Sequence, residues 1–317
     1  MPKPKKPKPV KVKKPIDPEQ AARFRRAMFH LVAAVVVIAL AGVGLWLDRR
    51  YVEHQIAFAK RPPKVVLKNR PVWMSDFLAE QIARAAKPVG ASSAFDHRLL
   101  VETVAQLEAN PWIRSVRQVR RVYDQSPGDT IEVDCEYRAP VALVHWKDYY
   151  WLVDEQGVKL PEAFGHADVP RIIKGADGKM NIRIVTGVAH APPEDGMKWP
   201  GEDLGAGIEL VKLLFGRVYA EEVVKVDVSN YGRRRDLKTS QIVLVTKYDT
   251  EVRWGQPVTP RPDEFFVEVT PAQKLAYMET IWKDKGRVDG KFAWVDIRYD
   301  TPTVPNTAQT ARTELAP

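Results

Sequence analysis

Residues 28–47 read MFHLVAAVVVIALAGVGLWL, and this stretch decides how the chain is organised. Its twenty residues include no Lys, Arg, Asp or Glu. As an α-helix they would cover roughly 30 Å, the thickness of the hydrocarbon core of a bilayer. Trp46 stands at the outer end, where a residue that favours the headgroup level is expected. We therefore predict a transmembrane helix from Met28 to Leu47.

A cleavable signal peptide is the main alternative for this segment, because Ala57-Phe58-Ala59 has the small residues of a cleavage site. However, the apolar core of a signal peptide is typically about 7 to 15 residues long and lies closer to its cleavage site. A buried core helix is the other alternative, but no polar face interrupts the apolar run. A membrane anchor fits the segment best.

The net charge of +9 is concentrated at the N-terminus. Residues 1–27 contain ten Lys or Arg and two acidic residues, whereas the rest of the chain carries a net charge of only +1. This distribution argues against a nucleic-acid-binding protein and predicts a cytoplasmic tail that contacts anionic membrane lipid. Five basic residues from Arg49 to Lys64 also follow the helix, but long C-terminal regions cross the membrane largely regardless of charge. We expect a single-pass protein of the inner (cytoplasmic) membrane with its C-terminal domains outside the cytoplasm.

The region after the helix is long enough for two modest hydrophobic cores. We predict a disordered basic tail, a transmembrane helix, a linker, a first α+β domain, a second, mostly β domain and a disordered C-terminal tail, at residues 1–27, 28–47, 48–63, 64–138, 139–301 and 302–317, respectively. The single Cys135 excludes an intrachain disulfide. Because Cys135 alternates with Ile131, Val133 and Tyr137, we expect a buried strand thiol.

The first domain shows the order strand, helix, helix, strand, strand. Val65 to Leu67 form a short strand, and a helix from Ser75 to Ala86 places Phe77, Leu78, Ile82 and Ala85 on one face. A second helix begins near Asp96, with Leu100, Val104 and Leu107 together, and ends at Asn110-Pro111. The run from Ile113 to Val122 has apolar residues at every third position, which predicts an irregular strand. In Thr130 to Tyr137 apolar and polar residues alternate regularly, which predicts a second strand. The order predicts a sheet with two helices on one face. The apolar positions of the irregular strand are Ile113, Val116, Val119 and Val122.

The second domain consists mainly of short strands and turns. We predict helices at Leu204 to Phe215 and after Thr270, where Pro271 and Gln273 complete an N-terminal capping pattern. Val224, Val226 and Val228 alternate and should share one face of a strand. The other predicted strands are Val141 to Trp146, Trp151 to Val153, Pro170 to Gly175, Ile242 to Lys247, Glu251 to Trp254 and Phe292 to Tyr299.

No motif of a phosphate loop, a zinc-binding helix or a hydrolase nucleophile occurs in the sequence. The glycine cluster Gly201 to Gly207 lacks the Lys of a phosphate loop and is interpreted as the lead-in to a helix. Asp195, Glu202 and Asp203 are candidates for an acid and base pair only in principle. We therefore predict a non-enzymatic binding protein with no cofactor, no metal and no small-molecule substrate.

Several segments, in order, resemble the FtsQ (DivIB) family of bacterial cell-division proteins. They lie behind a matching anchor, and any one of them alone would be weak evidence. Departures from the family pattern occur at Gly187 to Gly207, Arg233 to Asp236 and Pro257 to Pro262. The segments that carry the resemblance are Asn110 to Val116, Val119 to Tyr123, Thr130 to Val133, Arg138 to Ala142, Trp151 to Val158, Pro170 to Gly175 and Trp294 to Asp300.

The resemblance implies a POTRA (polypeptide transport-associated) domain at 64–138, followed by an FtsQ-type β domain at 139–301. It also implies a divisome scaffold at the septum that binds FtsB/FtsL-like division proteins and other divisome components, and that influences septal wall synthesis. The alternative is a POTRA module of protein export or envelope assembly. That alternative would show tandem repeats or the roughly 10-residue alternating strands of a barrel, and neither is visible.

The final predicted strand is the candidate partner site, because an edge strand offers unpaired backbone groups to which a partner segment adds as another strand. Within Phe292 to Tyr299, Val295, Ile297 and Tyr299 should share one face, and Trp294, Asp296 and Arg298 the other. The resemblance places Arg298, Tyr299 and Thr301 where family members contact FtsB. The alternative is that Arg298 is an ordinary solvated charge. The predicted partner-binding residues are Trp294, Asp296, Arg298, Tyr299 and Thr301.

Overall fold

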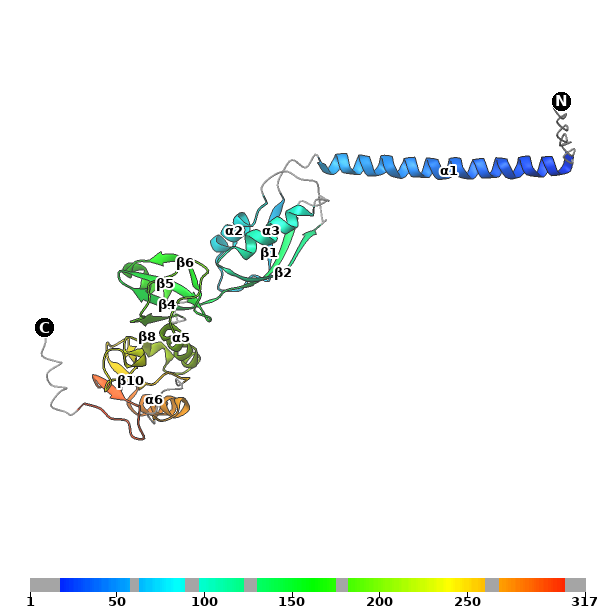
Figure 1. The fold of residues 1–317 in the computed structure, drawn as a ribbon. Helices are drawn as coiled ribbons and strands as arrows, with labels where there is room; N and C mark the ends of the chain where they lie inside the picture. Colours follow the sequence, from blue (N-terminus) through cyan, green and yellow to red (C-terminus); the bar gives the residue numbers. More distant parts are fainter. Residues whose placement is uncertain are drawn as a thin grey trace, which may run out of the picture. The chain divides into compact units, whose positions relative to one another are not determined.

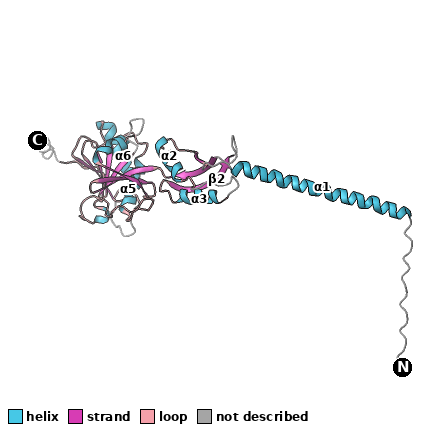
Figure 2. Ribbon diagram, turned by 90° about the horizontal axis from the view of Figure 1, so that it is seen from above, coloured by secondary structure: helices cyan, strands magenta, loops and turns pink. Residues whose placement is uncertain are grey.

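The computed structural model describes residues 18–57, 63–88, 97–122, 130–174, 182–259 and 268–305. The expectation of disorder at 1–17 and 306–317 lies outside these residues. The protein is a mixed α+β chain with an N-terminal apolar helix followed by a sheet-rich region (Figures 1 and 2). Within the described residues that region contains two sheets, one of three strands and one of eight.

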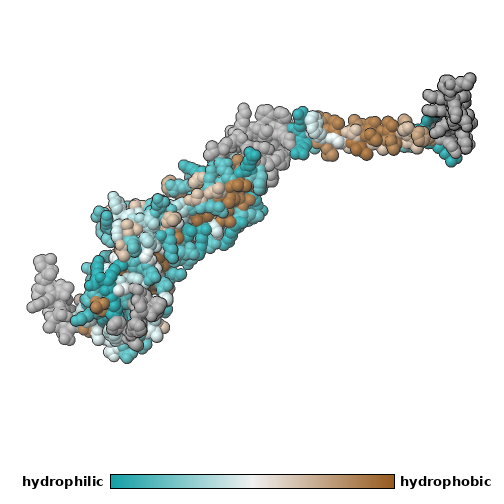
Figure 3. Space-filling view, in the orientation of Figure 1, coloured by the Kyte–Doolittle hydropathy of each residue, from teal (hydrophilic) through white to brown (hydrophobic). Residues whose placement is uncertain are grey.

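Helix α1 runs from Pro18 to Ala57 and belongs to a different unit of the chain from the two sheets. Its stretch Ala22–Tyr51 is long and apolar enough to cross a membrane. The side chains of Met28 to Leu47 are all exposed, and they form the hydrophobic band along α1 in Figure 3. The helix is longer than predicted: residues 18–27 and 48–57 are helical, not tail and linker. Pro18 suits a first helical turn, and no Pro interrupts the chain again before Pro62.

The three-stranded sheet has the predicted element order. Strand β1 (Lys64–Lys68) is followed by helices α2 (Asp76–Ala85) and α3 (Arg98–Glu108) and by strands β2 (Ile113–Val122) and β3 (Thr130–Tyr137). The strand order is β1-β3-β2, with β1 parallel and β2 antiparallel to the central β3.

The core of this layer confirms most of the predicted faces. Ile131, Val133 and Cys135 of β3 are buried, as are Ile82 of α2 and Leu107 of α3. Burial raises the pKa of the Cys135 thiol to about 11, which makes it an inert core group. In contrast to the prediction, the side chains of Phe77 and Ala85 in α2 are exposed, because Ile82 and Leu78 define a narrower buried stripe.

Two β-bulges explain why the apolar residues of β2 are three positions apart. The register shifts between Ile113 and Ser115 and again between Val116 and Gln118. Each bulge inserts one residue, so Ile113, Val116 and Val119 all lie opposite inward-facing residues of β3. The prediction of an irregular strand is confirmed.

The eight-stranded sheet has the order β11-β10-β9-β8-β7-β4-β5-β6, so β11 and β6 are its outermost strands among the described residues. The turn at Lys147-Asp148 lies between β4 and β5, and β9 and β10 pair antiparallel around Asp249. The strands are β4 (Pro140–Trp146), β5 (Tyr149–Asp154), β6 (Lys159–Phe164), β7 (Arg183–Thr186), β8 (Val223–Asp227), β9 (Ile242–Thr246), β10 (Glu251–Gly255) and β11 (Trp294–Asp296).

Two predictions for this sheet are wrong. The strand expected from Pro170 is helix α4 (Val169–Ile172), which continues the 3-10 turn η1 (His166–Asp168). Pro170 stands in the first turn of α4, where a missing N–H costs nothing. In β8 a register shift after Val223 places Val223, not Val224, with the buried Val226 and Val228.

Helices α5 (Asp203–Leu214) and α6 (Pro271–Lys285) pack on the main core of the eight-stranded sheet. Thr270 caps α6 by accepting a hydrogen bond from the Gln273 N–H at 3.3 Å, as predicted, and Gly286 ends the helix in the left-handed conformation. α5 ends one residue before Phe215, the last residue of the predicted helix, and the Phe215 side chain is half-exposed.

Candidate partner-binding surfaces

Strand β11 is shorter than the predicted strand from Phe292 to Tyr299. It pairs in parallel with β10, and the Ile297 N–H still donates to the Arg253 carbonyl at 3.2 Å. Val295 and Ile297 are fully buried, as expected, whereas Tyr299 is 52% exposed. The chain leaves the sheet after Ile297, so Tyr299 does not share the buried face.

The chain itself covers part of the outer edge of β11. The Asp296 N–H donates to the Thr303 carbonyl at 2.8 Å, and the Thr303 N–H donates to the Asp296 carbonyl at 2.9 Å. Residues 302–305, expected within the disordered tail, thus turn back against the strand. Because backbone groups alternate in direction along a strand, the N–H and C=O of Trp294 are the β11 groups that still point away from β10. A partner strand would therefore start at Trp294 or extend along the Thr303 segment.

Asp296 and Arg298 form an ion pair within the chain. The Arg298 Nη2 atom lies 2.6 Å from Asp296 Oδ2, and Arg298 Nε lies 3.0 Å from Asp296 Oδ1. Both side chains are largely buried, and the carboxylate raises the pKa of Arg298 by hydrogen bonding. Arg298 also donates to the Lys238 carbonyl at 3.4 Å. The charge expected to meet a partner is therefore already neutralised inside the chain.

The other predicted contact residues lie around this pair. The Arg253 guanidinium sits over the Trp294 ring, 4.0 Å from its centroid, which covers part of the indole. Tyr299 and Thr301 are both exposed. The structure thus brings all five predicted residues to one end of the sheet, but Tyr299 and Thr301 are the ones that present open side chains.

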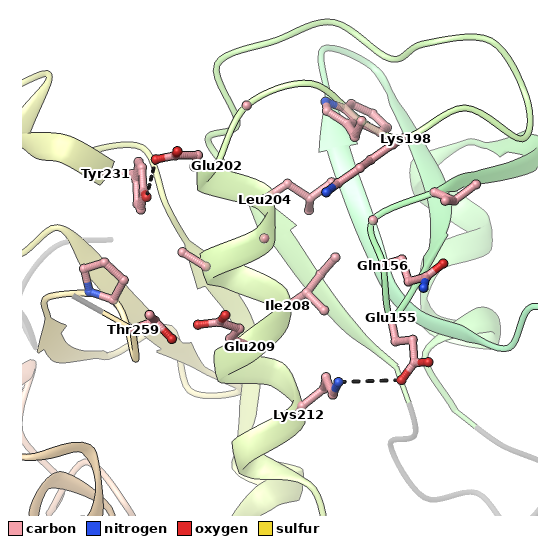
Figure 4. Close-up of a pocket in the computed structure, with 17 residues that line it drawn as sticks. Glu155, Gln156, Lys198, Glu202, Leu204, Ile208, Glu209, Lys212, Tyr231 and Thr259 are labelled. Atoms are coloured by element: carbon pink, nitrogen blue, oxygen red, sulfur yellow. Dashed lines mark hydrogen bonds and ion pairs between the residues drawn. The ribbon is translucent and has the colours of Figure 1, made fainter. Parts of the chain in front are cut away.

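A second surface, not predicted from the sequence, is a groove along helix α5 (Figure 4). We name it the α5 groove. It is half-open, with a volume of about 840 Å³. One wall is the turn at Glu155 to Val158 and the other holds Tyr231 and Thr259. Glu202, the N-cap residue of α5, lines the groove as well, and so do Glu209 and Lys212 of the helix and Lys198.

Two of the three carboxylates in this groove have a partner within the chain, and one has none among the described residues. Glu155 pairs with Lys212 at 3.6 Å, and Glu202 accepts a hydrogen bond from the Tyr231 hydroxyl at 3.2 Å (Figure 4). Glu209 makes no ion pair or hydrogen bond within the described part of the chain, and its carboxylate is exposed. The only sequence signal for this surface was the glycine cluster, which had been interpreted as a helix lead-in. Gly205 and Gly207 instead lie inside α5.

The candidate acid and base pair does not form. Asp195 pairs with Lys159, whereas Asp203 pairs with Arg234 at 2.7 Å. Glu202 is engaged by Tyr231. Each carboxylate thus has its own structural partner. Among the residues described here, no three His, Cys, Asp or Glu side chains are grouped as metal ligands.

No family model matches this chain, and no curated protein is detectably similar to it.

Proposed function

We propose that this chain is a non-enzymatic, membrane-anchored scaffold of bacterial cell division, of the FtsQ (DivIB) type. Its POTRA domain at 64–138 and its β domain at 139–301 then lie outside the cytoplasm and bind FtsB/FtsL-like partners at the septum. The observation that carries the proposal is the edge strand β11, with Tyr299 and Thr301 exposed beside it at the end of the eight-stranded sheet. The order β-α-α-β-β behind an apolar helix supports it.

The mechanism rests on two physical effects. An anchor such as α1 keeps the chain beside other membrane proteins, which raises the effective concentration of each for the other. A partner segment that adds to the β11 edge gains backbone hydrogen bonds from the strand, and side chains such as Tyr299 supply specificity. The buried Asp296–Arg298 pair holds this end of the sheet in place and leaves the recognition to neutral groups.

The partner site is tested by replacing Tyr299 with Ala and measuring capture of an FtsB-like protein from the same cells. Tyr149 is also 52% exposed, but it lies at the other half of the sheet, so Tyr149→Ala is the matched control. We expect Tyr299→Ala to weaken capture and Tyr149→Ala to leave it unchanged. Equal capture by both variants would refute a partner site at this edge.

Localisation of a fluorescent fusion tests the cell-division role itself. We expect the signal to concentrate at the division site before constriction. A uniform membrane signal throughout division would contradict the proposal and favour an export or envelope-assembly role.

A further inference from the structure

A buried arginine belongs to neither of the surfaces described above. Arg183 opens strand β7, between β4 and β8 of the eight-stranded sheet, and it is only 1% exposed. It stands two residues before Val185, so its side chain lies on the face of the sheet that α5 covers. Arginine is almost never fully buried unless it has a charged partner.

Arg183 has no charged partner among the described residues. Its Nη2 atom donates to the Ala220 carbonyl at 2.7 Å, but Nε and Nη1 make no hydrogen bond and the side chain forms no ion pair. Burial lowers the pKa of Arg183 to about 10, and no neighbouring carboxylate counteracts that effect. The side chain is still charged at neutral pH. The sheet therefore buries a cation with two free hydrogen-bond donors.

The contacts of Arg183 within the fold do not account for its charge. The Ala220 carbonyl already accepts a hydrogen bond from the Val223 N–H, so it does not depend on the guanidinium. An apolar side chain of similar length would fill the space without the cost of removing a charge from water. Local rules of stability are broken in this way mainly at functional sites. An unsatisfied buried donor that the fold does not need points to a ligand from outside the chain.

The Phe215 ring lies over the guanidinium, with Arg183 Cζ 5.4 Å from the ring centroid. Phe215 follows α5 directly and its side chain is 42% exposed, so the ring contacts both the arginine and the solvent. Val218, three residues further on, is 62% exposed. An aromatic ring attracts a cation less strongly than a hydrogen-bonded carboxylate does. A carboxylate that displaced the ring would therefore be a better partner for Arg183 than the one it has.

We propose that Arg183 is the binding site for a carboxylate carried by an apolar ligand, with Phe215 as a displaceable cover. The carboxylate accepts a hydrogen bond from a guanidinium nitrogen that is free in the chain, and it neutralises the buried charge. The apolar part of the ligand packs on Phe215 and Val218. An acidic side chain within an apolar segment of a partner protein has this chemistry. The proposal does not depend on the cell-division role.

Binding is measured with para-fluorobenzoate, a carboxylate on an apolar ring, by fluorine NMR titration of the full chain in detergent micelles. We expect saturable binding of this anion, and none of para-fluorobenzamide, which has a similar shape without the charge. Arg183→Met should weaken binding roughly tenfold or more, because it removes a hydrogen bond between charged groups. Phe215→Ala should tighten binding about threefold, since the ring no longer competes for the guanidinium. Arg171→Met removes an exposed arginine of α4 and is the matched control, which should bind like wild type.

Three results of this titration would overturn the proposal. They are the absence of saturable binding to the wild-type chain, equal affinities of wild type and Arg183→Met, and equal binding of the benzoate and the benzamide. Phe215→Ala keeps the test decisive if Arg183→Met does not fold, because the ring lies at the surface. Weaker binding by Phe215→Ala would refute its role as a cover.

Thermal unfolding separates a ligand site from an ion pair within the chain. Without ligand, Arg183→Met should melt no lower than wild type, because it removes a buried charge that has no partner. The benzoate should raise the melting temperature of wild type and leave that of Arg183→Met unchanged. Asp177 is the acidic residue nearest to Arg183 in the sequence, and it lies outside the described residues. A melting temperature of Arg183→Met below that of wild type would refute the proposal, and an equal loss in Asp177→Asn would identify the partner within the chain.

Discussion

Adding one methyl group at two positions of helix α5 should have opposite effects on stability. A Cβ atom at Gly207 would lie 2.9 Å from Val185 Cγ1 and 3.3 Å from Val228 Cγ1, and both valines are fully buried. A Cβ atom at Gly205, half a turn away, would meet nothing within 4 Å. Gly207→Ala and Gly205→Ala therefore share the same helix and the same chemical change, and differ only in packing.

The expected magnitudes follow from this difference. Replacing a helical glycine by alanine stabilises a protein by roughly 0.5–1 kcal/mol where there is space. We expect that gain for Gly205→Ala. The same gain applies to Gly207→Ala, but overpacking against two stiff β-branched side chains costs about 1–3 kcal/mol. The two variants should thus differ by about 1–3 kcal/mol in the free energy of unfolding, with Gly207→Ala the less stable.

Urea unfolding of the full chain in detergent micelles measures this difference. The buried Trp199 and Trp254 report the loss of the core by fluorescence. The comparison is meaningful when the slope of the free energy against urea is the same for both variants. Equal stabilities, or a stabilised Gly207→Ala, would refute the packing of α5 against β7 and β8.

Three further predictions concern buried groups. The Lys274 ammonium lies 2.6 Å from the buried Glu268 carboxylate. Lys274→Met should lower the stability of the fold by about 3–5 kcal/mol in thermal unfolding, because it leaves that carboxylate buried and unpaired. Combining Lys274→Met with Glu268→Leu should recover much of the lost stability. Cys135 should resist alkylation at pH 8 until the protein is unfolded, since burial raises the pKa of its thiol to about 11; rapid labelling of the native chain would contradict the core. Burial alone would raise the pKa of Asp289, but hydrogen bonds from Arg287 and Thr250 outweigh it and hold that pKa below 3.8. The stability that Asp289 contributes is therefore present above pH 4 and lost as pH falls through its folded pKa, so the stability gap between wild type and Asp289→Asn should narrow below pH 4.

Sequence periodicity predicted most of the elements, but it missed β6 and the four-residue β7, which is too short to show an alternation. The alternation in β3 gave its buried face correctly, and the cap at Thr270 located the start of α6. The errors in register occur at bulges. In β8, one inserted residue moves Val224 away from the face of Val226. A bulge leaves no local signal in a run of valines, whereas in β2 three successive apolar positions spaced by three revealed it.

Periodicity also could not show which charged side chains form ion pairs with each other. Asp296 and Arg298 were correctly placed on one face of the chain, and two residues apart on a strand is within reach of an ion pair. The sequence does not say whether Arg298 turns to Asp296 or to a partner, since that depends on burial. In the folded chain both side chains are largely buried. A partner that paired with Arg298 would therefore leave the Asp296 carboxylate buried and unpaired. Recognition at this edge must therefore depend on groups that are free to change partners, which is why the test of the proposed function is directed at Tyr299.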